Sequence, residues 1–443
     1  MKLTEGLKNM TKKAALHNLG CKVNAYETES MQQMLEAAGY EIVPFAPGAD
    51  IYIINTCSVT NIADRKSRQM LHKAKKMNPE AIVVAAGCYV ESEKHSGGKV
   101  DDAIDIVIGN NCKKDLIEIL EAYEDGKRSE AVIDINHTKE YEELTLNKTA
   151  EHTRAYVKVQ DGCNQFCSYC IIPYTRGRVR SRKAQDVYEE VVRLAEAGYH
   201  EVVLTGIHLG SYGVDLEEDT LLTLIEKIHR VEGIERIRLG SLEPRTMSEE
   251  FVAAIANLPK VCPHFHLSLQ SGCDETLKRM NRKYTADEYY EVCKRLRKYY
   301  ENPALTTDVI VGFAGETEEE FQQCKAFLEK IEFFETHVFK FSIRKGTRAA
   351  KMENQVPDQI KTKRSNELLA LHEKNSVKYL QEHLGKVLEV LMEEEVLING
   401  EKYFVGHTKE YIRVAVKTDE DLTNRFVTVT AKEILKDLIL LGE

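Results

Sequence analysis

Short runs of apolar residues alternate with amphipathic stretches over most of this chain. Near its beginning the apolar runs are continuous and rich in β-branched residues, as in strands that are buried on both faces of a parallel sheet. The pattern predicts strands at 14–19, 50–54, 81–86 and 104–108, and helices at 24–38, 61–77 and 112–124. We therefore expect a small flavodoxin-like or doubly wound α/β domain here.

The same alternation continues after about residue 153. Strands are predicted at 154–160, 201–205, 234–240, 264–269, 305–311 and 335–341, with helices between them, for example at 186–197 and 316–330. Six strand–helix units are fewer than the eight of a closed barrel. The pattern indicates an open, partial (β/α)6 barrel, whose functional residues should follow the carboxyl ends of the strands.

The pattern changes again near the end of the chain. A long helix is predicted at 358–384, and four short strands follow at 387–392, 403–408, 411–416 and 425–430. Four or five short strands in so few residues favour a small antiparallel β-barrel. We therefore predict an α/β protein with domains at 11–125, 151–378 and 379–443, and a linker at 126–150.

Three closely spaced cysteines carry the strongest chemical signal. Cys163, Cys167 and Cys170 follow the first predicted strand of the central region with C-x3-C-x2-C spacing. Thiolate is the usual ligand of 4Fe–4S clusters, so three thiolates leave one of the four irons open. Zinc sites usually join two C-x2-C pairs and close with four ligands, and the second pair is missing here. Phe166 and Tyr169 lie between these cysteines and would shield a cluster from water.

A second set of three cysteines follows a different rule. Cys21, Cys57 and Cys88 each end a short apolar run with the character of a buried parallel strand. The carboxyl ends of parallel strands are where open α/β sheets bind ligands, so these thiols should converge. The alternative is three unrelated core cysteines. The other five (Cys112, Cys262, Cys273, Cys293 and Cys324) show no ligand spacing and are interpreted as structural.

Composition limits the remaining possibilities. No apolar run reaches 18 residues, so no membrane span is expected, and residues 1–5 lack the apolar core of a signal peptide. An odd number of cysteines with two thiolate sets favours a reducing, cytoplasmic location. The net charge of −10 does not by itself indicate nucleic-acid binding.

Taken together, these motifs resemble the methylthiotransferase family of radical SAM enzymes. The resemblance covers nearly the whole chain and rests on the cysteine sets and on residues 20–29, 205–213, 239–244, 266–272, 307–317 and 341–347. Ala314 departs from it, because the family usually has proline there. Residues 55–60, followed by Ala63 and 66–69, are similar to the branch that acts on N6-threonylcarbamoyladenosine in tRNA; the isopentenyl-adenosine branch typically has arginine where Val59 and Thr60 stand.

The resemblance implies two 4Fe–4S clusters and S-adenosylmethionine (SAM) as cofactors. The cluster on Cys163, Cys167 and Cys170 would cleave SAM to a 5′-deoxyadenosyl radical. The cluster on Cys21, Cys57 and Cys88 would supply sulfur to C2 of the adenine, and a second SAM would supply the methyl group. The resemblance also implies SAM-binding residues in the segments 205–213, 239–244 and 266–272, and the candidates are Gly206, Gly210, Ser241, Glu243 and Gln270. The predicted C-terminal barrel would be a TRAM domain.

The expected partners are the tRNA anticodon stem-loop and an electron donor such as flavodoxin or ferredoxin. Arg176, Arg178, Arg180 and Arg182 follow the cysteine triplet and are interpreted as phosphate contacts, although a solvated charged surface is the alternative. A second basic surface is expected on the predicted helix 61–77, from Arg65, Lys66, Arg68, Lys73, Lys75 and Lys76. The predicted barrel is acidic, so its share of RNA binding is open, and docking a protein is the alternative.

Other functions fit part of the same pattern. The chain could methylthiolate another tRNA adenosine or a ribosomal protein side chain. From another class, it could be an RNA-binding iron–sulfur sensor without catalytic activity.

Overall fold

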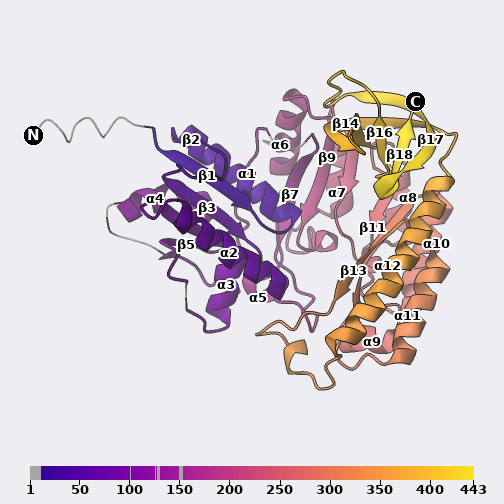
Figure 1. The fold of residues 1–443 in the computed structure, drawn as a ribbon, viewed down its shortest axis with the longest axis horizontal. Coiled ribbons are helices and arrows are strands. Elements are labelled where there is room, and N and C mark those ends of the chain that lie inside the picture. Colours follow the sequence, from indigo (N-terminus) through magenta and orange to yellow (C-terminus); the bar gives the residue numbers. More distant parts are fainter. Residues whose placement is uncertain (1–10, 100, 125, 127–129, 149–152) are drawn as a thin grey trace, which may run out of the picture. The chain divides into compact units, whose positions relative to one another are not determined.

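The computed structural model describes residues 11–443 except 100, 125, 127–129 and 149–152 (Figure 1). The chain forms two compact units. Unit 1 comprises residues 1–146, 160–182 and 342–350, and unit 2 comprises residues 147–159, 183–341 and 351–443. The loop that carries Cys163, Cys167 and Cys170 therefore belongs to unit 1, with the N-terminal cysteines.

A parallel sheet forms the centre of unit 1. Its strands are β1 (Lys13–Asn18), β2 (Glu41–Ile42), β3 (Ile51–Thr56), β4 (Ile82–Gly87), β5 (Ile106–Ile108) and β6 (Glu130–Ala131). All pairs in the order β2-β1-β3-β4-β5-β6 are parallel. Without β6 this is the flavodoxin-like strand order, as predicted.

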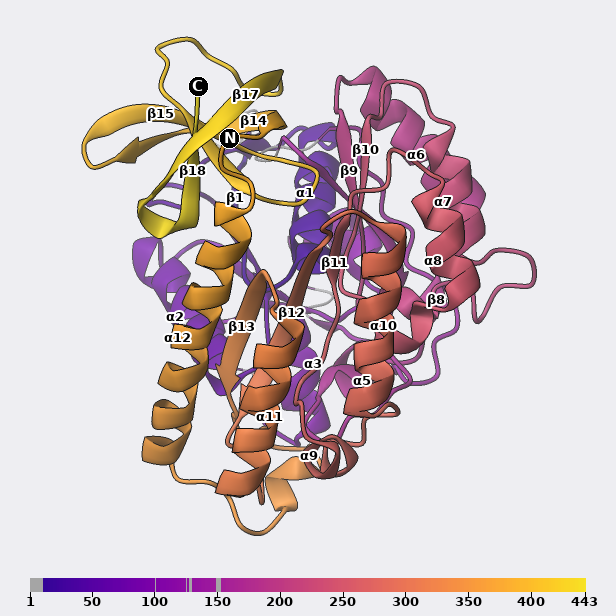
Figure 2. The same ribbon diagram turned by 90° about the vertical axis from the view of Figure 1, so that its right-hand side faces the viewer.

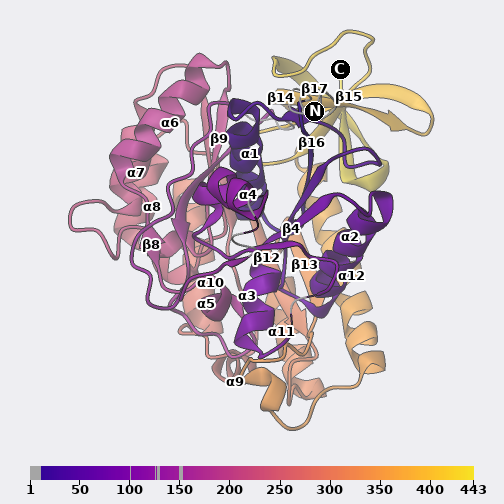
Figure 3. The same ribbon diagram turned by 90° about the vertical axis from the view of Figure 1, so that its left-hand side faces the viewer.

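Helices cover both faces of this sheet, as Figure 3 shows for the N-terminal segment. They are α1 (Lys22–Ala37), α2 (Asn61–Met77), α3 (Cys88–His95) and α4 (Leu116–Glu124). Because side chains alternate along a strand, Ile53 packs with α1 and α4 in one apolar cluster, while the adjacent Ile54 packs with α2 and α3 in another. This double burial explains the continuous apolar runs in the sequence.

Part of the predicted linker at 126–150 is folded into unit 1. Residues 130–131 form β6, and Leu144 and Leu146 are buried. The Tyr26 hydroxyl also donates a hydrogen bond to the Leu144 carbonyl at 2.5 Å. The low periodicity of this stretch did not reveal these contacts.

Unit 2 contains the predicted partial barrel. Its strands are β7 (Ala155–Asp161), whose last two residues continue into unit 1, β9 (Glu201–Gly206), β10 (Arg236–Leu239), β11 (His264–His266), β12 (Ala304–Val311) and β13 (Glu335–Lys340). They form the neighbours β10-β9-β7 and β11-β12-β13, and parallel bridges at Ile237–Val261 and Leu242–Leu267 lie between the two groups. The prediction of six strands in an open barrel is confirmed.

Helices follow the barrel strands in sequence. They are α6 (Ala184–Glu196), α7 (Leu221–His229), α8 (Glu249–Ala256), α9 (Asp274–Arg279), α10 (Ala286–Tyr299), α11 (Glu318–Ile331) and α12 (Asp358–Gln381). Figure 2 shows α10, α11 and α12 beside β11, β12 and β13. Apolar residues of these strands, such as Phe265 and Val309, pack with Leu296, Phe327 and Leu368 of the three helices. The residues at alternate positions of these strands point to the other face of the sheet.

The C-terminal segment of unit 2 is a closed five-stranded barrel. Its strands are β14 (Val387–Ile398), β15 (Glu401–His407), β16 (Arg413–Val416), β17 (Phe426–Leu435) and β18 (Ile439–Gly442), in the order β14-β15-β16-β18-β17. The pairs are antiparallel except β16 with β18, which are parallel. The hydrophobic pattern did not locate β18, which closes the barrel.

Buried arginines of β10 hold this barrel to the rest of unit 2. Arg238 donates to Glu201 at 2.7 Å and to the carbonyl of Lys409 at 2.9 Å, and Arg236 donates to the carbonyl of His407 at 2.8 Å. Charged groups this deeply buried require such partners. Within the described residues, no helix is long and apolar enough to cross a membrane.

Candidate functional site

The three N-terminal cysteines stand at neighbouring strand ends of unit 1. Cys21 follows β1, Cys57 follows β3 and Cys88 follows β4, and these strands are adjacent in the sheet. The chain order of the strands reverses between β1 and β3, because β2 lies on the other side of β1. Ligands bind open α/β sheets at such a reversal, beyond the carboxyl ends of the strands.

Hydrogen bonds hold the three cysteine-bearing segments together. The Asn24 amide donates to the carbonyl of Leu19 at 2.7 Å and to that of Thr56 at 3.0 Å. The Thr56 hydroxyl donates to the carbonyl of Ala86 at 2.5 Å and accepts from the backbone N–H of Tyr89 at 3.1 Å. The residues next to each cysteine are thus fixed relative to the other two segments.

Gly20 allows a close approach between two of these segments. Its φ is +111°, and a Cβ atom at this position would lie 2.9 Å from both Cβ and Sγ of Cys57. Glycine is therefore required twice over, for backbone conformation and for space.

The thiols of this set are close enough to affect one another electrostatically. Burial raises the pKa of Cys57 to about 11, and the neighbouring thiols of Cys88 and Cys21 also raise it, against the lowering effects of the Val59 backbone and Arg176. Metal ligands must be thiolates, so a bound cationic centre would have to supply the compensating positive charge. Cys21 is exposed, whereas Cys57 and Cys88 are buried.

The second set lies on a tightly folded loop, also in unit 1. Cys163 is buried, and Cys167 and Cys170 are half-buried. The backbone N–H of Cys170 donates to the Cys167 carbonyl at 3.0 Å, and that of Cys163 donates to the Gly177 carbonyl at 3.0 Å. The loop also contains α5 (Ile172–Thr175) and ends in β8 (Arg180–Ser181), which pairs antiparallel with the end of β7.

The donor chemistry of both sets fits 4Fe–4S clusters better than single ions. A single metal ion needs its ligand atoms close together. Among the described residues, His266, Asp308 and His337 form the group of possible ligands whose atoms all lie within 4.8 Å of one another, and this group includes no cysteine. Thiolates that share one tetrahedral zinc would lie about 3.8 Å apart, given Zn–S bonds of about 2.3 Å. A four-iron cluster binds each thiolate to a different iron and thus spaces them more widely.

The interpretation of Arg176 as an RNA contact is wrong. Its guanidinium is fully buried, donates to Glu27 at 2.9 Å and to Asp161 at 3.0 Å, and lies with Nε 3.3 Å from Sγ of Cys88. An arginine with two buried carboxylate partners cannot reach a phosphate without breaking both ion pairs.

The next arginines of the run are mostly buried as well. Arg180 donates to the carbonyls of Arg176 and Arg178, and Arg182 donates to the Tyr26 hydroxyl at 3.3 Å. Neither guanidinium is available to RNA in this conformation. Arg178 is the exposed member of the run and stacks on the ring of Phe166, 4.5 Å from its centroid.

A fifth arginine, Arg344, contacts the segment after Cys57 and was not singled out from the sequence. Arg344 is buried, forms an ion pair with Asp64, and donates to the hydroxyls of Ser58 at 2.7 Å and Ser92 at 3.1 Å. These partners lie on the loop after β3, on α2 and on α3. Residues 342–350 thus return to unit 1 and brace the cysteine-bearing loops.

The helix α2 carries the predicted second basic surface. Its exposed cations are Arg65, Lys66, Arg68, Lys73 and Lys76, whereas Lys75 is half-buried and paired with Asp105 at 2.7 Å. The placement of these cations on one surface helix agrees with the prediction, and their role in RNA binding stays a prediction.

The candidate SAM-binding residues all belong to unit 2. Gly206 ends β9, Gly210 follows in a short 3-10 turn, Ser241 and Glu243 follow β10, and Gln270 follows β11 with a φ of +69°. They stand after carboxyl ends of neighbouring strands, where the sequence placed them.

Glu243 is the ionisable residue among these five, and its surroundings shift its pKa. Burial opposes its ionisation, but the neighbouring His208 and the positive charge of Arg282 hold its pKa below the ordinary value. The His208 Nε2 lies 3.5 Å from its carboxylate, and Arg282 Nη2 lies 3.6 Å away. Glu243 is therefore a carboxylate at neutral pH.

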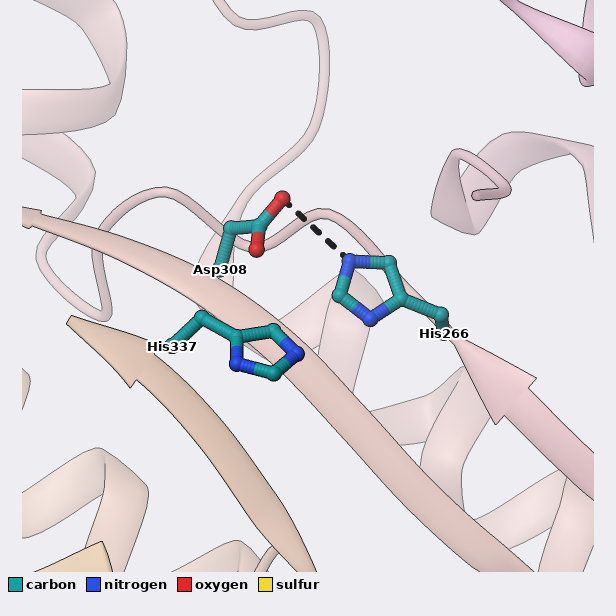
Figure 4. A group of neighbouring side chains, drawn as sticks. All are labelled: His266, Asp308 and His337. Atoms are coloured by element: carbon teal, nitrogen blue, oxygen red, sulfur yellow. Dashed lines mark ion pairs between the residues drawn. The ribbon is translucent and has the colours of Figure 1, made fainter. Parts of the chain in front are cut away.

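A polar cluster in unit 2 was missed by sequence reasoning. His266 of β11, Asp308 of β12 and His337 of β13 lie on adjacent strands, at positions that alternate with residues facing the helices (Figure 4). His266 Nε2 is 3.2 Å from Asp308 Oδ2, and its Nδ1 is 2.9 Å from the Thr306 hydroxyl. Two histidines and one carboxylate can hold a single metal ion or bind a polar substrate.

Residues 157–328 match the radical SAM superfamily, and residues 13–109 match the uncharacterized protein family UPF0004. In fold, the chain is similar to the radical S-adenosylmethionine methyltransferase TsrM of Kitasatospora setae, solved with cobalamin and a 4Fe–4S cluster. The TM-score is 0.54, the identity 16%, and the match covers 75% of this chain and 72% of TsrM.

Curated relatives match over most of the chain. It is 40% identical to the threonylcarbamoyladenosine tRNA methylthiotransferase MtaB of Bacillus subtilis (strain 168), covering 94% of this chain and 92% of the relative. It is 39% identical to the tRNA-2-methylthio-N(6)-dimethylallyladenosine synthase of Thermoanaerobacter pseudethanolicus, covering 85% and 81%.

This chain is a radical SAM enzyme. Within that superfamily, it belongs to the tRNA methylthiotransferase family. Its cofactors are accordingly 4Fe–4S clusters and SAM, as the motif resemblance implied.

The crowding at Gly20 yields a testable prediction. Gly20→Ala should remove the second cluster, because the new methyl would overlap Cys57 Sγ, so iron per reconstituted chain should fall by about half. Gly39→Ala is the matched control, since its φ is +88° but nothing lies within 4 Å of the new Cβ. Both changes carry similar backbone strain of roughly 1–3 kcal/mol. Full iron content in Gly20→Ala would contradict this picture of the site.

Proposed function

We propose that this protein inserts a methylthio group at C2 of N6-threonylcarbamoyladenosine, next to the anticodon of tRNA. One observation carries the proposal: unit 1 holds a second three-cysteine set at the reversal point of its sheet, in addition to the triplet on the radical SAM loop. A reaction that both activates a C–H bond and delivers sulfur needs two such sites.

The two sets divide the chemistry. Cys163, Cys167 and Cys170 would hold the cluster at which SAM is cleaved to the 5′-deoxyadenosyl radical. Cys21, Cys57 and Cys88 would hold the cluster that carries the sulfur. The hydrogen at C2 would leave as part of 5′-deoxyadenosine, and C2 would bond to the sulfur. A second SAM would supply the methyl to that sulfur and leave as S-adenosylhomocysteine. Clusters of this kind need an external electron, and flavodoxin or ferredoxin would be the donor.

The residues after the barrel strands would bind SAM. Glycines at 206 and 210 permit close approach of the backbone, and a Cβ at Gly210 would meet the Thr246 hydroxyl at 2.1 Å. The ionised carboxylate of Glu243 suits the amino group of methionine or a ribose hydroxyl. Ser241 and Gln270 would contribute further polar contacts.

The exposed cations of unit 1 would bind the anticodon stem-loop. The cations of α2 present a local positive surface even though the whole chain carries −10, and Arg178 is a further exposed cation of unit 1. Phosphate contacts of this kind position an RNA without reading its sequence. Anticodon-loop bases are single-stranded, so presenting one to the enzyme costs little unstacking energy. A tRNA substrate also accords with a cytoplasmic location.

The cluster of His266, Asp308 and His337 would contact the substrate nucleoside. The opposite face of these strands is filled by the helices, so this face of the sheet is the one that an entering base can reach. Asp308 holds His266 from one side and the Thr306 hydroxyl holds it from the other, which fixes the orientation of the ring.

Three alternatives are distinct from this proposal. The first is tRNA bearing isopentenyl-adenosine, because a tRNA-2-methylthio-N(6)-dimethylallyladenosine synthase matches this chain at similar identity. A ribosomal protein side chain or a sensor role without catalysis would need no modified adenosine at all. Residues Val59 and Thr60, where the isopentenyl branch typically has arginine, favour the threonylcarbamoyl substrate.

A competition assay separates these substrates. Reconstituted enzyme, SAM and reductant should convert tRNA bearing N6-threonylcarbamoyladenosine to its 2-methylthio form, at least tenfold faster than tRNA bearing isopentenyl-adenosine. Mass spectrometry of nucleosides from a mixture of both tRNAs measures the ratio directly. Preference for the isopentenyl substrate, or modification of neither tRNA, would overturn the proposal.

A second prediction concerns Asp308. Asp308→Asn should raise the KM for tRNA several-fold and leave SAM cleavage in the absence of tRNA unchanged, because the side chain is proposed to meet the nucleoside. Steady-state kinetics and 5′-deoxyadenosine yield measure the two effects. If this change instead removes a bound ion seen by metal analysis of the purified protein, the cluster is a metal site and the proposed substrate contact is wrong.

A further inference from the structure

Arg176 stands between the two cysteine sets. In sequence it belongs to the loop of Cys163, Cys167 and Cys170, and in space its Nε lies 3.3 Å from Sγ of Cys88, a member of the other set. All of these residues are in unit 1. The contact is therefore an N–H donor from one cluster-bearing loop aimed at a sulfur of the other.

The orientation of this guanidinium is fully determined. Nη1 donates to Glu27 at 2.9 Å and to Asp161 at 3.0 Å, and Nη2 donates to Asn24 at 2.7 Å and to Glu27 at 3.1 Å. Together with the contact to Cys88, every nitrogen of the planar fork has a partner, and the side chain is fully buried. The Nε–H can then point only toward the sulfur.

Arg176 shares both of its carboxylate partners with other buried cations. Glu27 is shared with the buried ammonium of Lys113, at 3.2 Å, and Asp161 lies 3.8 Å from Arg180. Each of the two carboxylates therefore serves two cations, and the guanidinium places its positive charge beside the sulfur. Screening by salt is weak at a buried site, so this positive charge acts on the neighbouring sulfur.

Hydrogen bonds to sulfur and nearby positive charge both favour the more reduced state of an iron–sulfur cluster. Reduction adds negative charge, and a donor aimed at a ligand sulfur stabilises that charge. An arginine at this position should thus raise the reduction potential of a cluster bound through Cys88.

We propose that Arg176 is a positioning residue of the second cluster, which hydrogen-bonds the Cys88 sulfur, raises the potential of that cluster and fixes the radical SAM loop against it. The proposal rests on the proposed function in so far as Cys21, Cys57 and Cys88 hold a cluster. Lysine cannot replace this arginine, because a point charge lacks the planar fork that reaches Cys88, Glu27 and Asp161 together.

The test uses the full chain with Cys163, Cys167 and Cys170 changed to alanine, so that the remaining iron reports on the second site alone. In this parent, arginine labelled with nitrogen-15 should give a nitrogen-15 hyperfine coupling to the reduced cluster in pulsed EPR. The coupling should disappear when Arg176→Lys is added. The coupling itself is measured with Arg176 in place, so this part of the test does not require the Arg176→Lys variant to fold.

The potential is measured in the same parent. Arg176→Gln should shift the midpoint potential of the cluster to more negative values. The matched control is Arg178→Gln. Arg178 lies two residues after Arg176 and is exposed, so removing its charge should leave the potential unchanged. An unchanged potential in Arg176→Gln, or a reduced cluster without nitrogen-15 coupling, would overturn the role of Arg176 alone. A parent that binds no iron would overturn the second cluster itself, and with it the proposed function.

Discussion

The reversal of strand order in the parallel sheet of unit 1 is the constraint on which the site depends. Carboxyl ends of parallel strands lie at one edge, so three cysteines distant in sequence become neighbours without a shared loop. A separate loop motif then places the other three cysteines within the same compact unit. One sheet and one loop thus bring two three-thiol sets into one body of the protein.

Buried arginines are the second feature that this arrangement requires. Irregular loops around cysteines leave few backbone partners, and the structure uses Arg176 and Arg344 to tie them together through carboxylates and hydroxyls. Each buried charge is costly unless it is paired, and breaking such a pair typically costs 3–5 kcal/mol. The same need for hydrogen-bond donors inside the loop explains why Arg176, Arg180 and Arg182 are buried and structural.

Much of the architecture could be predicted from the pattern of apolar residues. Strands of unit 1 are buried on both faces by four helices, so their apolar runs are continuous and easy to recognise. The cysteines were predictable because each ends such a run. β6 and β18 were not located, since strands of two and four residues are too short to show a periodicity.

The roles of individual polar residues were harder to predict. Arg176 and Arg178 are two residues apart in one basic run, yet one is buried and the other exposed. What decides this is Glu27, which lies far away in sequence on α1 and becomes a partner only in the folded unit. His266, Asp308 and His337 also meet only through strand register. Such groupings depend on tertiary contacts that spacing along the chain does not encode.

The central claim is that the two cysteine sets bind iron independently. Mössbauer spectroscopy and iron analysis of anaerobically reconstituted protein test it most directly. The wild-type chain should hold about eight irons in two 4Fe–4S clusters, and changing either set of three cysteines to alanine should leave about four. If one triple variant loses all iron, or keeps about eight, the two-site account is contradicted.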